Sequence, residues 1–443
     1  MRFIHRYTPL FILLFIFSLA LPVIALQETN GSDIPGRIAY VGDDFNIHVF
    51  DAATEETVDL TDNASSTVRY QWPTWSKDGR LAYFCCDLEF ATDFNTSAYI
   101  SSDAVSPGRL VFDAVGESVI YAAWAPASCD DATCRELAML VNSVQTGGLN
   151  LTMVRDTRED AQVDIVAMGS PFYYSWSPDA SQLAFHRNNR RLSIYSGALG
   201  DVDESLDQRT SGAFQAPHWS PVDHRILLGL PGDGPRRTNL VILEEGDVTI
   251  LAENLVGSLS FSWSPDGQYV AYRVLDDNGY GPLLVVDSTT GGIISQTVLR
   301  DIVAFFWSPD SSKLAYVTPA IAGGDSASNP SAQHQYVQYT PGEFQPIQSD
   351  FALSWNVLDI ESDLSTTFEP FLPTPGLIYM ILYFDQFAQS HNIWSPDSQY
   401  IVYPELMLED SMVSLVQIRN VLDVTALPIA IGHGGFAVWS YGE

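Results

Sequence analysis

The chain has 443 residues, which is long enough for one to three hydrophobic cores. Of these residues, 46% are hydrophobic, 12% aromatic and 17% charged, a composition that argues against a disordered chain. Its formal net charge of −33 disfavours nucleic acids and anionic membranes as partners, because such a surface repels phosphate groups. The excess acid either maintains solubility or attracts cations or a basic partner. Many aromatic residues and only two lysines, Lys77 and Lys313, favour strands over helices.

The N-terminus is typical of an exported protein. Arg2 and Arg6 precede an apolar run, Leu10–Ala25, that ends in short side chains and is brief for a membrane span. We therefore expect a cleaved signal peptide at residues 1–25, a short linker at residues 26–36, and a secreted, periplasmic or cell-surface protein. An uncleaved N-terminal anchor is the alternative, and it is the only membrane association that we expect.

The ends of the remaining chain predict how a ring closes. Residues 37–41, 46–52 and 57–61 have the pattern of the second, third and fourth strands of a sheet, with no first strand before them. Residues 435–443 have the pattern of a first strand with nothing after it. We expect this C-terminal strand to complete the N-terminal sheet, which removes two exposed sheet edges.

A tryptophan followed by a turn recurs along the chain. Successive members lie 49, 52, 43, 44, 44, 87 and 45 residues apart, and a period in the mid-forties is that of a four-stranded propeller blade. An eight-bladed, all-β propeller spanning residues 37–443 follows. We interpret the tryptophans as structural anchors between blades: Trp75, Trp124, Trp176, Trp219, Trp263, Trp307, Trp394 and Trp439.

The residues that follow the anchor tryptophans are types that favour a tight turn. In Ser264-Pro265-Asp266-Gly267, proline presets one backbone angle, aspartate can bond to the backbone, and glycine tolerates a positive φ. The repeated aspartates could instead form a ring of catalytic or metal-binding carboxylates. We favour the structural role, because each aspartate lies in the turn of its own blade.

The interval of 87 residues between Trp307 and Trp394 predicts one blade with a long insertion at residues 319–351 and extra length at residues 372–390. Two blades, one of them degenerate, would make nine in total. Trp355 lacks the following turn, so we expect one blade.

Four cysteines fit an oxidising compartment. Cys129 and Cys134 bracket a short polar loop and are expected to form a disulfide. For Cys85 and Cys86 the sequence leaves three options: a vicinal disulfide, two thiols, or links to the other pair. No histidine stands near either pair at a usual ligand spacing, so we expect no metal site.

The segments WSPDGQYVAY, WSPDSSKLAY, WSPDASQLAF and WSPDSQYIVY resemble the TolB-like propeller repeat, a relative of WD repeats. The resemblance covers nearly the whole chain after the signal peptide and implies the propeller fold. It says little about function, because such propellers serve as scaffolds, binding modules and accessory domains. TolB itself carries a preceding α/β domain that has no counterpart in this sequence, so a role in the Tol system does not carry over.

We expect no catalytic residues and no cofactor. No G-x-S-x-G motif is present for a hydrolase nucleophile, and Gly432-His433-Gly434-Gly435, which is similar to an oxyanion-hole motif, has no nucleophile to serve. His218 and His391 lie near first strands and could reach the channel, although a structural role is favoured for such histidines.

Most insertions fall on one face of the predicted ring, and length added to one rim of a rigid scaffold points to a working surface. The candidate binding residues there are Tyr336, Tyr339, Tyr383, Phe384 and His391. The alternative is that these insertions merely cap the channel. We expect a monomeric, exported binding or scaffold module for a protein or peptide, with a glycan-binding module or a propeller hydrolase or lyase as alternatives.

Overall fold

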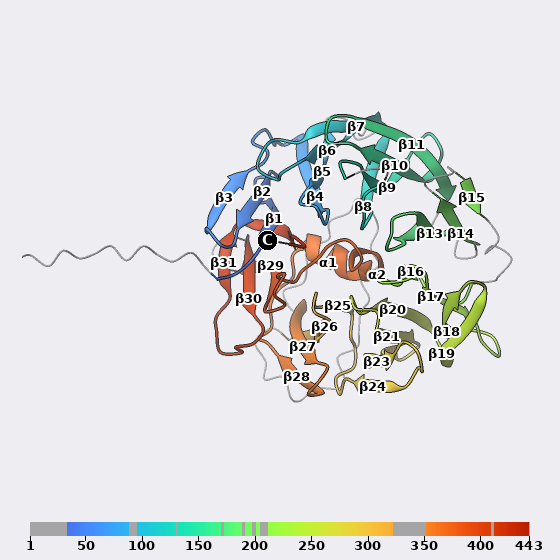
Figure 1. Ribbon diagram of the computed structural model, residues 1–443. Helices are drawn as coiled ribbons and strands as arrows, with labels where there is room; N and C mark the ends of the chain where they lie inside the picture. The colour runs from blue at the N-terminus through green and yellow to red at the C-terminus, as the bar shows by residue number, and fades with distance from the viewer. Residues whose placement is uncertain are drawn as a thin grey trace, which may run out of the picture. The chain divides into compact units, whose positions relative to one another are not determined.

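The computed structural model describes residues 33–87, 95–129, 132–169, 172–187, 191–196, 201–203, 211–321, 351–408 and 412–442. These residues form eight blades of antiparallel strands arranged in a ring, a β-propeller (Figure 1). The predicted fold class is confirmed. The predicted signal peptide at residues 1–25 lies outside the described residues.

The strands of each blade are named from innermost to outermost. Blade 1 consists of β32 (Gly434–Trp439), β1 (Arg37–Gly42), β2 (Ile47–Asp51) and β3 (Glu56–Asp59), and blade 2 of β4 (Val68–Trp75), β5 (Leu81–Asp87), β6 (Asn95–Ser101) and β7 (Arg109–Val115). Blade 3 consists of β8 (Glu117–Trp124), β9 (Arg135–Ser143), β10 (Gly148–Asp156) and β11 (Ala161–Gly169). Blade 4 consists of β12 (Phe172–Trp176), β13 (Gln182–Arg187), β14 (Arg191–Ser196) and β15 (Asp201–Asp203).

Blades 5 to 8 follow the same plan. Blade 5 consists of β16 (His218–Trp219), β17 (Ile226–Pro231), β18 (Arg237–Glu244) and β19 (Asp247–Val256). Blade 6 consists of β20 (Ser258–Trp263), β21 (Tyr269–Asp276), β23 (Leu284–Asp287) and β24 (Ile293–Gln296), and β22 (Gly279–Tyr280) also pairs with β21. Blade 7 consists of β25 (Ala304–Trp307), β26 (Lys313–Ile321), β27 (Phe351–Asp359) and β28 (Leu364–Thr367). Blade 8 consists of β29 (Tyr400–Leu408), β30 (Met412–Asn420) and β31 (Ile429–Gly432), and its innermost position is the bridge between Trp394 and Ile401.

The ring closes as the ends of the chain predict. Strand β32 pairs antiparallel with β1, with Trp439 opposite Ile38 and Phe436 opposite Val41. The Trp439 indole also donates to the Pro35 carbonyl oxygen at 3.0 Å, so residues of the predicted linker take part in closure. Backbone pairing between β32 and β1 thus joins the two ends of the propeller and gives blade 1 its four strands.

The anchor tryptophans join neighbouring blades through one repeated hydrogen bond. The Trp124 indole donates to the carbonyl oxygen of Thr74, the residue just before the anchor of blade 2, and the Trp176 indole donates likewise to Ala123 in blade 3. The same bond is made by Trp75 to Val438, Trp263 to His218 and Trp394 to Phe306. Burial of a large ring and satisfaction of its N–H by the preceding blade account for the repeat.

The turn after each anchor uses its side chains locally. The Ser264 hydroxyl donates to the Asp266 carboxylate at 2.5 Å and accepts from the Tyr269 amide at 2.9 Å, and Asp266 accepts from the Gln268 amide at 3.0 Å. Equivalent Ser–Asp bonds occur in blades 2, 4, 7 and 8. Residue Gly267 has a φ of 71°. The structural role assigned to these aspartates is what the geometry shows.

The long interval holds a single blade. Strand β26 runs to Ile321 and β27 begins at Phe351, so the first three residues of the predicted insertion at 319–351 belong to a strand. Trp355 lies in β27 and is not an anchor. The last residue of that insertion, Phe351, begins β27, and residues 322–350 lie outside the described residues.

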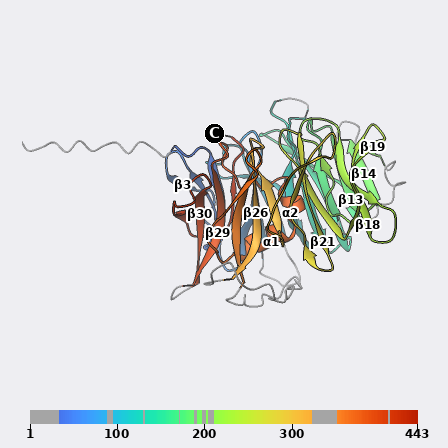
Figure 2. The same cartoon turned by 90° about the horizontal axis from the view of Figure 1, so that it is seen from below.

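Two short helices are not expected from the strand pattern of the sequence. Helix α1 (Pro375–Leu382) and helix α2 (Phe384–Phe387) both fall within residues 372–390, which the sequence predicts as extra length on one rim. The Thr374 hydroxyl caps α1 by accepting from the Leu377 amide, and Pro375 occupies the first turn, which is the usual start of a helix. Figure 1 shows both helices at the centre of the ring, and Figure 2 shows them within its thickness.

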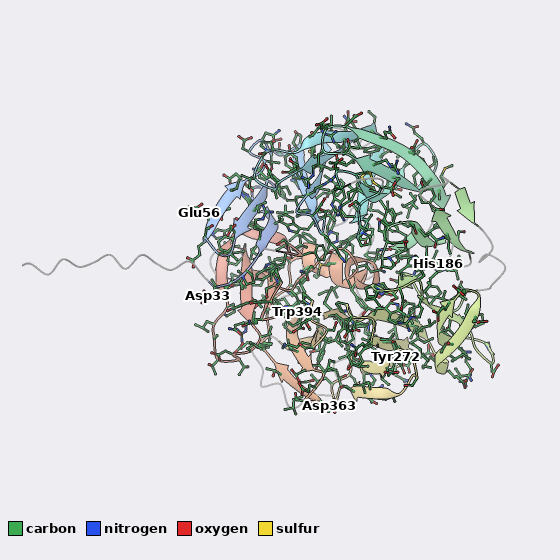
Figure 3. The ribbon with its side chains drawn as sticks, viewed as in Figure 1. Asp33, Glu56, His186, Tyr272, Asp363 and Trp394 are labelled. Carbon is green, nitrogen blue, oxygen red and sulfur yellow. A yellow bond between two sulfur atoms is a disulfide. The ribbon has the colours of Figure 1, made fainter. Side chains whose placement is uncertain are left out.

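The core lies between the blades and around these helices. Trp394 is fully buried near the centre, whereas Glu56 and Asp363 lie at the outer edge (Figure 3). The largest group of buried apolar side chains includes residues from the inner strands together with Leu377, Phe384 and Phe387 of the helices. The helices are therefore part of the packed interior.

Candidate functional site

A segment of the chain occupies the channel of the propeller; we call residues 374–391 the plug. Phe384 and Phe387 are each 1% exposed. The Phe384 ring lies 4.8 Å from that of Phe305 in blade 7, and the Phe387 ring lies 5.2 Å from that of Tyr121 in blade 3. The plug thus packs against blades on opposite sides of the channel, and it fills the space with apolar rings.

Gln386 fastens the plug to the inner edge of blade 4. Its side-chain oxygen accepts from the Tyr174 amide at 2.8 Å, and its side-chain nitrogen donates to the Tyr174 carbonyl oxygen at 2.7 Å. The Tyr121 hydroxyl donates to the Gln386 carbonyl oxygen at 2.9 Å. An innermost strand has backbone groups that no further strand pairs, and this amide satisfies both groups of one residue.

A buried charge lies beside this contact. Burial raises the pKa of Asp385 to about 6, although the nearby Arg273 guanidinium and a hydrogen bond from Ser260 oppose the rise. The Arg273 guanidinium lies 4.8 Å from the Phe384 ring centre and 4.1 Å from that of Tyr280, and it donates to the Val303 carbonyl oxygen. The plug and blade 6 therefore share an electrostatic contact whose strength depends on pH.

His391 ends the plug as a neutral, buried group. Burial lowers its pKa to about 3. One ring nitrogen lies 2.6 Å from the Ser390 hydroxyl and the other 3.2 Å from the Thr74 hydroxyl of blade 2. Both nitrogens therefore have partners within the protein, and the residue serves packing in this structure.

A cavity remains where the plug meets the turns of blades 2 to 5. Its volume is about 150 Å³, and its walls are the anchor tryptophans of these four blades and the phenol rings of Tyr121, Tyr174 and Tyr441. The prolines of three anchor turns and the plug residues Gln389 and Ser390 complete it. We call the surface formed by the anchor turns the turn face, and the cavity opens there.

Three side chains of this cavity have nitrogens for which the described ranges contain no hydrogen-bond or ion-pair partner. Trp219 is the anchor of blade 5, but its indole nitrogen has no hydrogen-bond acceptor within the described part of the chain, and the same holds for Nδ1 of His218. Burial lowers the pKa of His218 to about 3, so its ring is neutral. Lys77 is exposed, and its ammonium group has no ion-pair or hydrogen-bond partner among the residues that the structure covers.

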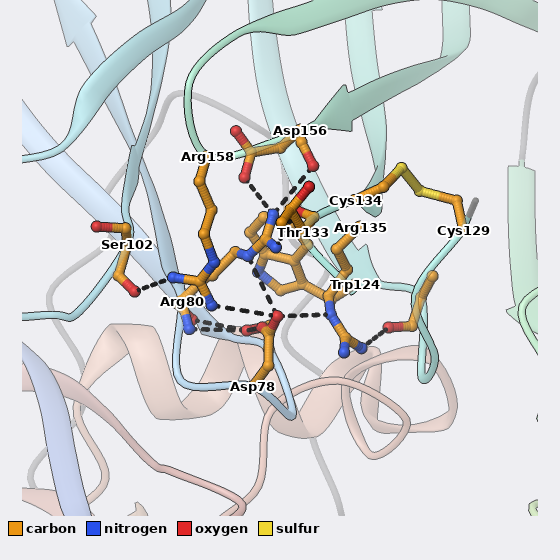
Figure 4. A network of polar contacts seen from close by, with 12 residues as sticks. Asp78, Arg80, Ser102, Trp124, Cys129, Thr133, Cys134, Arg135, Asp156 and Arg158 are labelled. Atoms are coloured by element: carbon orange, nitrogen blue, oxygen red, sulfur yellow. Dashed lines mark hydrogen bonds and ion pairs between the residues drawn. A yellow bond between two sulfur atoms is a disulfide. The ribbon is translucent and has the colours of Figure 1, made fainter. Parts of the chain in front are cut away.

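Next to the cavity, a network of arginines and aspartates joins blades 2 and 3 (Figure 4). The Asp78 carboxylate lies 3.3 Å from Arg80, 3.2 Å from Arg135 and 3.4 Å from Arg158. Asp156 pairs with both Arg80 and Arg109. Burial acts to raise the pKa of Asp78, but a hydrogen bond from Ser76, together with these ion pairs, lowers it below the usual value.

The predicted disulfide holds the loop beside this network. Cys129 and Cys134 are bonded, with their Cα atoms 5.4 Å apart, which confirms that prediction. The Arg80 guanidinium donates to the carbonyl oxygen of Thr133, and Arg135 follows the bridge directly. Cys85 is buried in β5, and the side chain of Cys86 lies outside the described residues.

The three candidate binding residues that the structure describes do not form an exposed face. Phe384 and His391 are buried in the plug, and Tyr383 is half-buried at the junction of α1 and α2. Tyr336 and Tyr339 lie outside the described residues. A binding role for these five residues stays a prediction, and for Phe384 and His391 it would require the plug to move.

Two further geometric findings concern only the described ranges. No group of three or more His, Cys, Asp or Glu side chains is placed so as to hold a metal ion there. No helix in these ranges is long and apolar enough to cross a membrane.

No protein-family model and no curated protein matches the sequence. The fold is similar to a eukaryotic initiation factor (11% identity over 91% of this chain and 98% of that one, TM-score 0.50) and to an oligogalacturonate lyase in complex with manganese (14%, 85% and 94%, TM-score 0.47). TolB from Acinetobacter baumannii is also similar (18%, TM-score 0.35), over 61% of this chain and 66% of that chain. At these identities the similarities concern the propeller fold alone.

Proposed function

We propose that this chain is an exported, non-catalytic propeller that binds a protein or peptide outside the cytoplasm, built from repeats of the TolB-like type. The observation that carries the proposal is the aromatic cavity on the turn face. It lies on a rigid ring, and it holds polar nitrogens that no protein group engages within the described ranges. A concave site lined by aromatic residues with a few polar groups is typical of ligand-binding sites.

The plug supports a binding role at the surface over chemistry deep in the channel. Its apolar rings occupy the axis of the propeller, and a concave surface remains at the turn face, where the cavity lies. The disulfide between Cys129 and Cys134, beside this mouth, supports an oxidising location. The apolar run at residues 10–25 supports export.

Site-specific photocrosslinking in the organism that encodes the chain tests this proposal. Pro221 is exposed and lines the cavity, whereas Leu364 is 69% exposed on the outermost strand of blade 7. We expect Pro221→benzoylphenylalanine to give a discrete crosslink to a protein or peptide and Leu364→benzoylphenylalanine to give none. Equal crosslinking at both positions, or none at either, would count against a binding module that uses this face.

A further inference from the structure

The size and walls of the cavity on the turn face limit what can enter it. A volume of about 150 Å³ is that of an apolar cavity that binds a benzene-sized molecule. Tyr121, Tyr174, Tyr441 and the four tryptophans line it, and small parts of these rings face the cavity, because the tryptophans, Tyr121 and Tyr174 are at most 9% exposed. One apolar or aromatic side chain fits such a space, whereas a helix or a sugar chain does not.

The anchor of blade 5, which lines this cavity, departs from the hydrogen bond that most other anchors make. In six blades the anchor indole donates to a backbone carbonyl oxygen, and in blade 5 the Trp219 indole has no acceptor among the described residues. Trp307 also lacks an acceptor there but does not line the cavity. A buried N–H without an acceptor is unfavourable, so an acceptor supplied by a ligand would be favoured.

Lys77 is the only charged side chain among the described residues that line the cavity, in a chain whose net charge is −33. The neighbouring network of four guanidinium groups (Arg80, Arg109, Arg135 and Arg158) and two carboxylates (Asp78 and Asp156) lies beside it. The Asp78 carboxylate is already shared by three guanidinium groups. The Lys77 ammonium is therefore left for an anion from outside.

Lys77 is placed to receive that anion. It is exposed at the surface and lines the cavity. Partial burial of its ammonium group and, as a smaller cause, the charge of the Arg135 guanidinium lower the pKa of Lys77, so Arg135 lies near enough to add to the positive field there. An anion at this rim gains from both cations without displacing any existing ion pair.

We propose that the cavity on the turn face binds the C-terminus of a peptide, with the terminal carboxylate on Lys77 and an apolar or aromatic last side chain between the rings. This inference rests on the proposed function and names the part of the partner that is recognised. The shared chemistry is a carboxylate on a compact apolar group, which a small free acid also has.

Calorimetric titration of the full chain after its leader, with the disulfide intact, tests the site. The probes are acetyl-Gly-Gly-Phe as the free acid, the same peptide as its C-terminal amide, and 3-phenylpropionate. We expect the peptide acid to bind at least tenfold more tightly than the amide and than 3-phenylpropionate. Equal affinity for acid and amide would overturn the carboxylate site, and tighter binding of 3-phenylpropionate would overturn the peptide terminus as ligand.

The two lysines of the chain provide a matched pair of variants. Lys77→Gln should lower the affinity for the peptide acid about tenfold and leave the affinity for the amide unchanged. Lys313→Gln removes the same charge in blade 7, where the ammonium contacts Ser312 and Asp310, and should bind like the wild type. An equal loss in both variants would overturn the role of Lys77. Failure of all three probes, with the Pro221 crosslink still present, would refute this site and leave the proposed function standing.

Discussion

The contact between Gln386 and blade 4 offers a quantitative test of how the plug is held. Gln386→Leu keeps a side chain of similar size but removes both groups that bond to the backbone of Tyr174. The bond from the Tyr121 hydroxyl goes to the backbone of residue 386 and is not removed by the substitution. The variant therefore isolates the side-chain amide.

The expected loss follows from the two backbone groups left without partners. Gln386 is 3% exposed, so water does not replace the amide. A buried N–H or carbonyl oxygen without a partner costs about 1–3 kcal/mol, so the free energy of unfolding should fall by about 2–6 kcal/mol. That is a large share of the roughly 5–15 kcal/mol that stabilises a typical folded domain.

Urea unfolding at pH 7, followed by circular dichroism, measures this loss. Chymotrypsin should also cleave the variant faster at Phe384 and Phe387, because a loosened plug exposes them. Gln162→Leu on the exposed face of β11 is the control and should change the unfolding free energy by less than about 0.5 kcal/mol. A loss in Gln386→Leu no larger than in this control would refute the account of the plug.

Three further predictions concern pH, a turn and the disulfide. Burial raises the pKa of Asp385 to about 6 from 3.8, so the folded protein holds a proton that the unfolded chain loses, and stability should fall as pH rises between about 4 and 6. Asp385→Asn should remove on the order of 2 kcal/mol of that fall between pH 4.5 and 7 in urea titrations, and parallel curves would contradict this. Gly267→Ala should lower the free energy of unfolding by at least about 1–2 kcal/mol, because φ is +71° and the new Cβ would lie 2.5 Å from the Val222 side chain. In the control Gly435→Ala, the new Cβ would meet no atom within 4 Å, so the free energy of unfolding should hardly change. Replacing Cys129 and Cys134 together by serine should cost about 2 kcal/mol from loop closure, and an unchanged urea midpoint would speak against a stabilising bridge.

The propeller architecture could be predicted because each repeat unit contains the sequence features that form one blade. The period between anchors sets the size of a blade, and the unmatched strands at residues 37–61 and 435–443 determine how the ring closes. The Ser-Pro-Asp-Gly turns contain their own hydrogen-bond partners within five residues, so their role can be worked out without tertiary information.

The plug could not be placed in the same way. The sequence Thr374-Pro375 is a recognisable start of a helix and could have revealed α1. The position of the helices depends on partners far away in the chain, such as Tyr174 for Gln386, 212 residues apart. Aromatic residues in an insertion fit an exposed contact surface as well as a packed channel, and only the fold separates the two.

The cavity on the turn face was likewise beyond sequence reasoning. Ser-Pro follows Trp219 as it follows four other anchors, and nothing in this pattern marks Trp219 as an indole without an acceptor among the described residues. The unpaired state of Lys77 within those residues depends on the three arginines that engage Asp78, of which Arg135 and Arg158 come from blade 3. The sequence contains only two lysines, Lys77 and Lys313, and this scarcity is the one feature of the sequence that singles out Lys77.

Competition for the Pro221 crosslink tests the binding account most directly. If a partner inserts its C-terminus into the cavity on the turn face, excess acetyl-Gly-Gly-Phe acid should abolish the crosslink, and the same concentration of the amide should leave it intact. A crosslink that survives the acid, or that both peptides suppress equally, would contradict recognition of a terminal carboxylate at this mouth.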